Sequence, residues 1–514
     1  MIRNAIVPLA ALLCGLSSFG HAACVPGKLP SPVPRDPVVR ILAAQGTCPK
    51  DAVEFVAAVK QSGLRTEPAM VNFASFHSPD FGAFFFFEIV SSEGARSAAL
   101  NVERGDLLFG HFTDVDADKL VSFKSKKELM IELIAWDPDK QFYNFYELAD
   151  GGWFYRGDSE SILDDVKMLH RERPASTGPF PAKPQLRCSG CHINGGLLQK
   201  ELAPPHNDWF LRSRNLPLGK LKPDSFVQDR LAATLDAGEL SKLVAASARR
   251  LADSPKYRAA LAARTMQEQL RPLFCPMELN IESDSTPLDD HKPTLTVPSA
   301  FFVDPRLASA EISIRRTHYD AAVRALTSRL PDTNPRRADA DHGWLTPVKA
   351  HSDVVAVDSL IERGIVSRQF EVAVLAVDFT NPVFSPMRCG LLKLVPNRRD
   401  ADFVTSFQGA LRGSSAPGAA ELVANLTDPA RNVALHEKQA AAFLTACRQQ
   451  ASDGDTVSDW YRLLAQRRVE VATSEISQHP EGSILESPER TVFPSTKPKA
   501  VAGRLALTPD CKVR

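Results

Sequence analysis

Residues 129–136 read LMIELIAW, and residues 142–148 read FYNFYEL. Both runs are rich in aromatic and branched apolar side chains, and the segment DPDKQ between them is typical of a short loop. The two runs therefore predict a β-hairpin. Residues 153–155 follow the turn formers Asp150, Gly151 and Gly152, and they predict a third strand.

This hairpin belongs to a longer strand-rich region. Residues 84–90 form another aromatic run, and the pattern from about 68 to 160 predicts an antiparallel meander with one packed face and one wet face. Its aromatic side chains are expected in the core. Most later segments have helical patterns, so the expected fold class is α+β.

The helical patterns extend from the N-terminal part to the C-terminal part of the chain. Ser254 with Pro255, and Ser352, have the features of helix starts, and Asp236 with Glu239 resembles a capping box. Residues 370–379 are apolar and fit either a helix or a strand. The predicted helices cover residues 49–62, 159–169, 225–270, 318–330, 353–363, 419–450 and 457–467.

The chain is long enough for more than one domain. The expected division is a signal peptide at 1–23, a β-rich domain at 24–170, a helical region around the motif at 171–280, and a mainly helical domain at 281–514.

The motif is Cys188-Ser189-Gly190-Cys191-His192, a Cys-x-x-Cys-His sequence. This is the pattern of a c-type haem attachment site. The two thiols bind the porphyrin edge covalently and the histidine binds iron. On a helical turn, positions i, i+3 and i+4 share one face, so all three side chains can reach one flat macrocycle.

At these residues the chain resembles the c-type cytochromes. The resemblance implies one covalent haem c per chain, held by Cys188 and Cys191, with His192 as an iron ligand. Two other kinds of site share part of the pattern. A thioredoxin-like site should follow a buried strand, but residues 171–187 contain four prolines, and a zinc ribbon needs a second Cys-x-x-Cys, which the sequence lacks.

The motif does not identify the ligand on the other side of the iron. A methionine there suits electron transfer, whereas an open position suits binding of a small oxidant. The candidates are Met277 and His206, with Met266, Met387 and His170 as further options. Each of these residues could instead be structural.

Residues around the motif have expected supporting roles. The second ring nitrogen of His192 should donate to a carbonyl or carboxylate. Arg187 could pair with a haem propionate. Gly195 and Gly196 would allow the backbone to approach a cofactor closely.

The N-terminus predicts export. Arg3, the apolar run 5–16 and the small residues before Cys24 predict a signal peptide cleaved near Ala22 or Ala23. Lipid attachment at Cys24 is an alternative. The mature chain lacks another long apolar run and is expected to be soluble, without a transmembrane segment. Haem attachment in c-type cytochromes takes place outside the cytosol, so the resemblance implies the periplasm.

Cysteine content and charge narrow the function further. Lys+Arg and Asp+Glu both number 61, which argues against nucleic acid as the main partner. Six cysteines remain besides the motif and the signal peptide, and an oxidising compartment favours disulfides over the alternative of buried thiols. The predicted pairs are Cys24–Cys48, Cys275–Cys389 and Cys447–Cys511.

These observations favour a periplasmic monohaem c-type cytochrome that passes electrons to a redox partner not identified by the sequence. The alternative is a haem c enzyme that activates peroxide or dioxygen, because a carrier rarely needs several hundred residues beyond its haem region. A further alternative is a disulfide-stapled secreted binding protein without haem.

Overall fold

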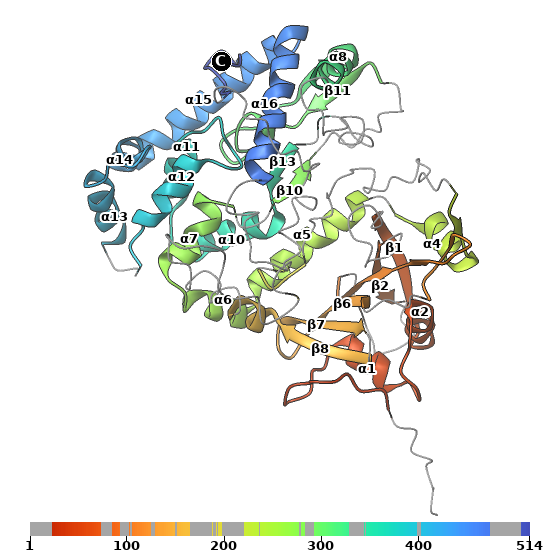
Figure 1. The fold of residues 1–514 in the computed structure, drawn as a ribbon. Coiled ribbons are helices and arrows are strands. Elements are labelled where there is room, and N and C mark those ends of the chain that lie inside the picture. Colours follow the sequence, from red (N-terminus) through yellow and green to blue (C-terminus); the bar gives the residue numbers. More distant parts are fainter. Residues whose placement is uncertain are drawn as a thin grey trace, which may run out of the picture.

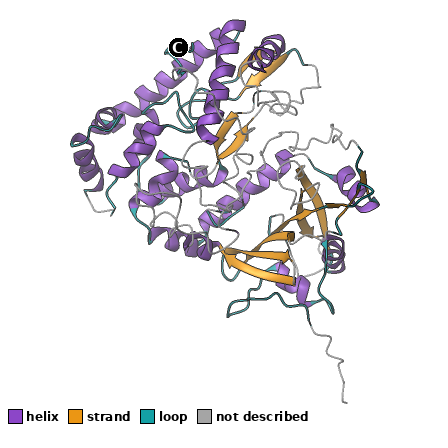
Figure 2. Cartoon of the chain, viewed as in Figure 1, coloured by secondary structure: helices purple, strands orange, loops and turns teal. Residues whose placement is uncertain are grey.

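The computed structural model describes residues 23–72, 85–92, 102, 105–124, 129–149, 152–164, 188, 192, 194–197, 220–235, 237–276, 279–282, 292–327, 344, 346–397, 402–472 and 505–514. A sheet dominates the N-terminal part and helices dominate the rest, which confirms the α+β fold class (Figures 1 and 2). Among the helices in these ranges, none combines the length and apolar character needed to cross a membrane.

Six strands form one antiparallel sheet in the order β1-β2-β3-β6-β7-β8. The predicted hairpin is β6–β7, in which Asp137 lies opposite Phe142, and the predicted third strand is β8. The strands are β1 (Leu64–Asn72), β2 (Phe85–Ser92), β3 (Leu107–Phe112), β6 (Leu129–Asp137), β7 (Phe142–Ala149) and β8 (Gly152–Asp158).

Three small sheets accompany this large one. Their strands are β4 (Asp114–Val115), β5 (Leu120–Ser122) and β9 (Lys222–Pro223) in one sheet, β10 (Leu279–Glu282) with β13 (Thr346–Lys349), and β11 (Thr294–Val297) with β12 (Ile312–Arg315).

Helices pack on the sheet and form most of the C-terminal part (Figure 1). They are α1 (Pro37–Ala43), α2 (Ala52–Gln61), α4 (Ser225–Ala233), α5 (Ala237–Asp253), α6 (Pro255–Ala262), α7 (Met266–Phe274), α8 (Arg316–Thr327), α10 (His351–Glu362), α11 (Arg368–Ala376), α12 (Pro386–Leu391), α13 (Phe403–Arg412), α14 (Ala419–Thr427), α15 (Pro429–Gln450) and α16 (Gly454–Ala472), with 3-10 turns η5 (Ser299–Phe301) and η6 (Leu392–Leu394).

Both faces of the large sheet are covered, so the prediction of one wet face was wrong. Strand β7 is buried along its whole length, and its side chains alternate between two cores. Tyr146 and Leu148 pack in the core that contains α1 and α2, whereas Tyr143 and Phe145 pack in the core that contains α5 and α6. The aromatic side chains are core residues, as predicted. The helices that cover the second face come from far along the chain, and strand periodicity does not encode them.

Most helix predictions are confirmed. The span 225–270 contains α4, α5, α6 and the start of α7. Ser254 caps α6 by accepting the backbone N–H of Tyr257 at 3.2 Å, with Pro255 as the first helical residue. Residues 370–379 lie mainly in helix α11. The proposed capping box at Asp236 lies outside the described residues.

Two helix predictions were wrong in detail. Ser352 does not cap α10, because this helix begins at His351 and Ser352 lies within its first turn. The span 419–450 is not one helix but two. Asp428 and Pro429 separate them, since Asp428 caps the second helix and proline is tolerated at its first position.

The three predicted disulfides are all present, and they stabilise different parts of the fold. Cys24–Cys48 closes the N-terminal segment. Cys275–Cys389 joins the end of α7 to α12, and Cys447–Cys511 ties the C-terminal residues 505–514 to α15.

Ion pairs also join the sheet-packed helices to the C-terminal helices. Helices α5 and α10 lie side by side (Figure 1). Arg249 of α5 contacts Asp358 at 2.8 Å and Glu362 at 3.2 Å, both on α10, and Arg306 contacts Asp358 at 2.7 Å. Asp358 therefore pairs with Arg249 from the helices packed on the sheet and with Arg306 from the C-terminal part of the chain.

A buried carboxylate fixes α1 against the middle of the sheet. Asp36 is fully buried and accepts the backbone N–H groups of Val38 and Val39 at 2.9 and 3.1 Å. Its other oxygen accepts from the Tyr146 hydroxyl at 2.5 Å and the Asn144 amide at 2.7 Å. Burial outweighs these hydrogen bonds and raises the pKa of Asp36 to about 6.

This raised pKa gives a testable pH dependence. The folded chain holds the Asp36 proton more tightly than the unfolded chain, so this contribution to stability is present below about pH 4 and is lost as the pH rises through 6. Relative to Asp36→Asn, which does not titrate, the wild-type free energy of unfolding should fall by about 2–3 kcal/mol between pH 4 and pH 7. Denaturant unfolding of both proteins at each pH measures this difference, and parallel pH profiles would contradict it.

Candidate functional site

Of the five motif residues, the structure describes Cys188 and His192. The backbone N–H of His192 donates to the carbonyl of Cys188 at 2.9 Å, which is the i to i+4 bond of an α-helix. Residues at this spacing extend from the same side of a turn. Cys188 is half-buried and packs against the apolar core shared by β7, α5 and α6. Cys191 lies outside the described residues.

The imidazole of His192 is held in one tautomer. Its Nδ1–H donates to the carbonyl of Gly196 at 2.7 Å, because a carbonyl can only accept. In a neutral imidazole this arrangement places the lone pair on Nε2. The Phe145 ring on β7 packs against the imidazole in a T-shaped arrangement, with ring centroids 5.0 Å apart. The expected hydrogen bond to a backbone carbonyl is therefore present.

Gly195 forms the turn that brings the Gly196 carbonyl within hydrogen-bonding distance of the imidazole. Its φ of +69° is in the left-handed region, and its N–H donates to the His192 carbonyl at 2.7 Å. A Cβ at Gly195 would lie 2.7 Å from the carbonyl oxygen of Ser159. In the structure the backbone that closely approaches Gly195 is that of Ser159.

Ser159 joins this turn to the sheet. Its hydroxyl donates to the Gly195 carbonyl at 2.6 Å and accepts the backbone N–H of Tyr143 on β7 at 2.9 Å. The turn carrying the imidazole acceptor is therefore fixed to the same strand whose Phe145 contacts the imidazole.

Asn194 fixes the other side of the turn. Its backbone carbonyl accepts from the Tyr257 hydroxyl of α6 at 2.8 Å. Its side-chain amide donates to the Ser352 hydroxyl of α10 at 3.0 Å. Sequence reasoning missed Ser159, Tyr257 and Ser352 as supports of the site. No local signal identifies them, since they lie far from the motif along the chain.

Two of the candidate iron ligands, Met266 and Met387, pack in or against the C-terminal hydrophobic core. Met266 is buried in the C-terminal core. Met387 packs against that core, and its Cγ lies 2.7 Å from where a Cβ of Gly418 would be. The remaining candidates, Met277, His206 and His170, and the proposed propionate partner Arg187, lie outside the described residues.

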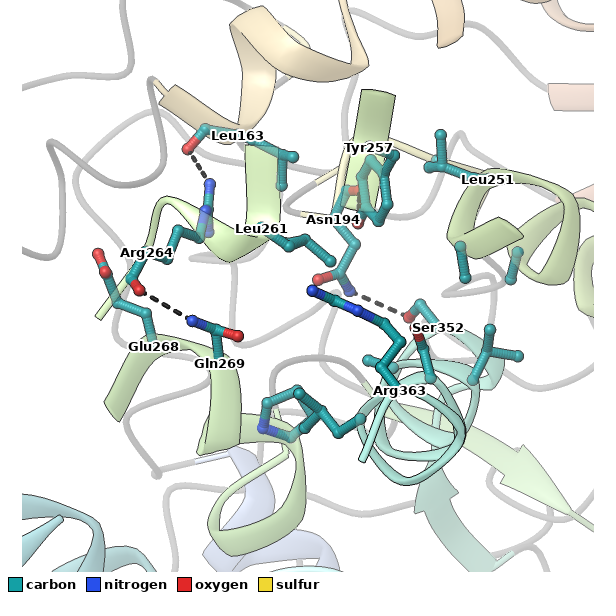
Figure 3. A pocket seen from close by; sticks show the side chains of 18 of the residues that line it. Leu163, Asn194, Leu251, Tyr257, Leu261, Arg264, Glu268, Gln269, Ser352 and Arg363 are labelled. Atoms are coloured by element: carbon teal, nitrogen blue, oxygen red, sulfur yellow. Dashed lines mark hydrogen bonds between the residues drawn. The ribbon is translucent and has the colours of Figure 1, made fainter. Parts of the chain in front are cut away.

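A cleft adjoins the turn after the motif (Figure 3). It has a volume of about 60 Å³ and lies among α5, α6, α7 and α10. Asn194, Gly196 and Leu197 form part of its wall, whereas neither Cys188 nor His192 lines it. Within the described part of the chain, no group of three or more His, Cys, Asp or Glu side chains is arranged to hold a metal ion.

Comparisons with protein-family models, with curated proteins and with solved structures found no significant match to this chain.

The close packing at Gly195 gives a test of how the turn is built. Gly195→Ala adds both the left-handed strain and a clash with the Ser159 backbone, so it should lower the free energy of unfolding by about 2–4 kcal/mol. Gly364→Ala is the matched control, because Gly364 has a φ of +62° and a Cβ at this position would meet no atom within 4 Å.

The control isolates the backbone strain, which should cost about 1–2 kcal/mol. Denaturant unfolding of the two variants measures the difference between them. Equal losses of stability would show that the contact between Gly195 and Ser159 does not restrain the turn.

Proposed function

We propose that this protein is an exported monohaem c-type cytochrome that transfers electrons. The observation that carries the proposal is the Cys-x-x-Cys-His sequence combined with a His192 imidazole held by Gly196 in the tautomer that ligates through Nε2. Covalent attachment would use Cys188 and Cys191, and His192 would bind the iron.

The described residues fit such a group. Cys188 and His192 are joined by a backbone hydrogen bond of α-helical spacing, and both contact an apolar core that would exclude water from one side of a macrocycle. When bound, a haem c supplies an iron centre that gains and loses one electron. The chain's own part is to keep a proton on His192 Nδ1, to orient the ring through Gly196 and Phe145, and to surround it with apolar side chains.

The three disulfides support the proposed export. Disulfides persist in oxidising compartments, and the periplasm is one of them. The same compartment is where the resemblance to c-type cytochromes would place haem attachment. Export to the periplasm is therefore part of the proposal.

A haem c enzyme acting on peroxide or dioxygen is the second candidate. The observation that favours it is the cleft, which gives a small molecule a place beside the turn that holds His192. Electron transfer remains the first choice, because the motif accounts for it without a substrate.

Replacing the two motif cysteines tests the attachment. The double variant Cys188→Ala with Cys191→Ala should show no covalent haem on a stained denaturing gel, when produced in cells able to mature c-type cytochromes. The control is Cys24→Ala with Cys48→Ala, which also removes two thiols but leaves the motif intact. Retention of stain in the first variant, or a colourless wild-type band, would overturn the haem proposal.

Carbon monoxide separates carrier from enzyme. In a carrier the second axial position is filled by a side chain, so the reduced protein should bind carbon monoxide slowly and incompletely. Absorption spectra recorded after mixing measure this. Rapid and complete binding would instead favour the enzyme that activates a small oxidant.

A further inference from the structure

Asn194 joins the turn after the motif to a helix of the C-terminal part. It lies between His192 and Gly196, whose hydrogen bond fixes the imidazole tautomer. The side-chain amide of Asn194 donates to the Ser352 hydroxyl of α10 at 3.0 Å, although the two residues are 158 positions apart in the sequence (Figure 3). This contact fixes the turn relative to α10, which hydrogen bonds within the turn cannot do.

Helix α10 is itself held against α5, and the two helices lie side by side (Figure 1). At the start of α10, the Nε2 atom of His351 lies 3.1 Å from the Ser241 hydroxyl of α5. Further along, Arg249 of α5 forms ion pairs with two carboxylates of α10. Helix α5 packs in the apolar core that Cys188 contacts. The hydroxyl of Ser352 therefore has a defined position relative to the motif.

The position of the Gly196 carbonyl determines the strength of the hydrogen bond that His192 Nδ1 donates. A strong hydrogen bond at this nitrogen makes the imidazole a more basic ligand for a metal at its other nitrogen. A more basic ligand favours oxidised iron, because oxidised iron carries one more positive charge than reduced iron. A residue that holds this turn in place should therefore lower the midpoint potential.

We propose that Asn194 and Ser352 are positioning residues for the iron ligand, and that the C-terminal helices help to set the midpoint potential through this pair. Both residues act through the turn that carries the Gly196 carbonyl. The inference rests on the proposed function, because the protein has such a potential only if His192 binds a haem iron.

Redox titration of the full-length, haem-loaded protein tests the proposal. Ser352→Ala removes the acceptor of the Asn194 amide, so the oxidised form should lose part of its preference. A loss of about threefold raises the midpoint potential by about 28 mV. Ser352→Thr keeps a hydroxyl at this position and should keep the wild-type potential.

Ser359→Ala is the matched control, because it also removes one hydroxyl from α10. Ser359 is 4% exposed, and its Oγ has no hydrogen-bond partner among the described residues. Its removal should leave the potential at the wild-type value. A merely structural role for Ser352 would lower the stability of Ser352→Ala without changing its potential. That result would overturn the proposal, as would an equal rise in potential in both variants.

A double-mutant cycle checks that the two residues act through one contact. Asn194→Ala should raise the potential about as much as Ser352→Ala does. The double variant should show no further rise, because each single variant already removes the same hydrogen bond. Additive rises would show that the two residues act separately, and they would overturn the proposed link.

Nitrogen NMR of the histidine rings separates this inference from the haem proposal. If the wild-type protein is colourless, the haem proposal fails, and the tautomer of His192 then tests the positioning. The His192 signals are those lost in His192→Gln. The neutral wild-type ring should carry its proton on Nδ1, and Ser352→Ala should move part of the population to Nε2. Equal tautomer populations in wild type and Ser352→Ala would overturn the positioning. In a haem-loaded protein, a potential unaffected by Ser352→Ala overturns the positioning alone.

Discussion

The hydrogen bond from His192 Nδ1 to the Gly196 carbonyl is the constraint on which the candidate site depends. It fixes the tautomer of the imidazole, and it exists only because Gly195 turns the chain back through a left-handed conformation. Ser159 restrains this turn, because its hydroxyl forms hydrogen bonds with the Gly195 carbonyl and with the backbone N–H of Tyr143. A single glycine thus connects the chemistry of the motif to the buried middle of the sheet.

Elements from distant parts of the chain hold the turn that follows the motif. The turn is held by the sheet through Ser159, by α6 through Tyr257 and by α10 through Ser352. Those elements belong to both the sheet-packed and the C-terminal helices, which the ion pairs of Arg249 with Asp358 hold together. The cleft lies at the same junction, and Asn194 and Gly196 form part of its wall.

Local sequence patterns predicted many of the helices and strands of this fold. They did not predict which elements distant in the sequence pack together. The hairpin and the Ser254 cap depend on residues within a few positions of each other, where periodicity and capping chemistry are informative. The covered second face of the sheet depends on which distant helix packs there. Ser352 illustrates the limit: its type and position predicted a helix cap, but a contact with Asn194 determines its role.

The disulfide connectivity has a consequence for how the chain could mature. In order along the sequence, each cysteine that the described residues show in a disulfide pairs with the next such cysteine, and no bridge encloses the start of another. A chain entering an oxidising compartment from its N-terminus can therefore close each bridge before the following pair arrives. Cys188 lies between the first bridge and the second along the chain, so in the proposed export its thiol would arrive with few competing thiols left unpaired.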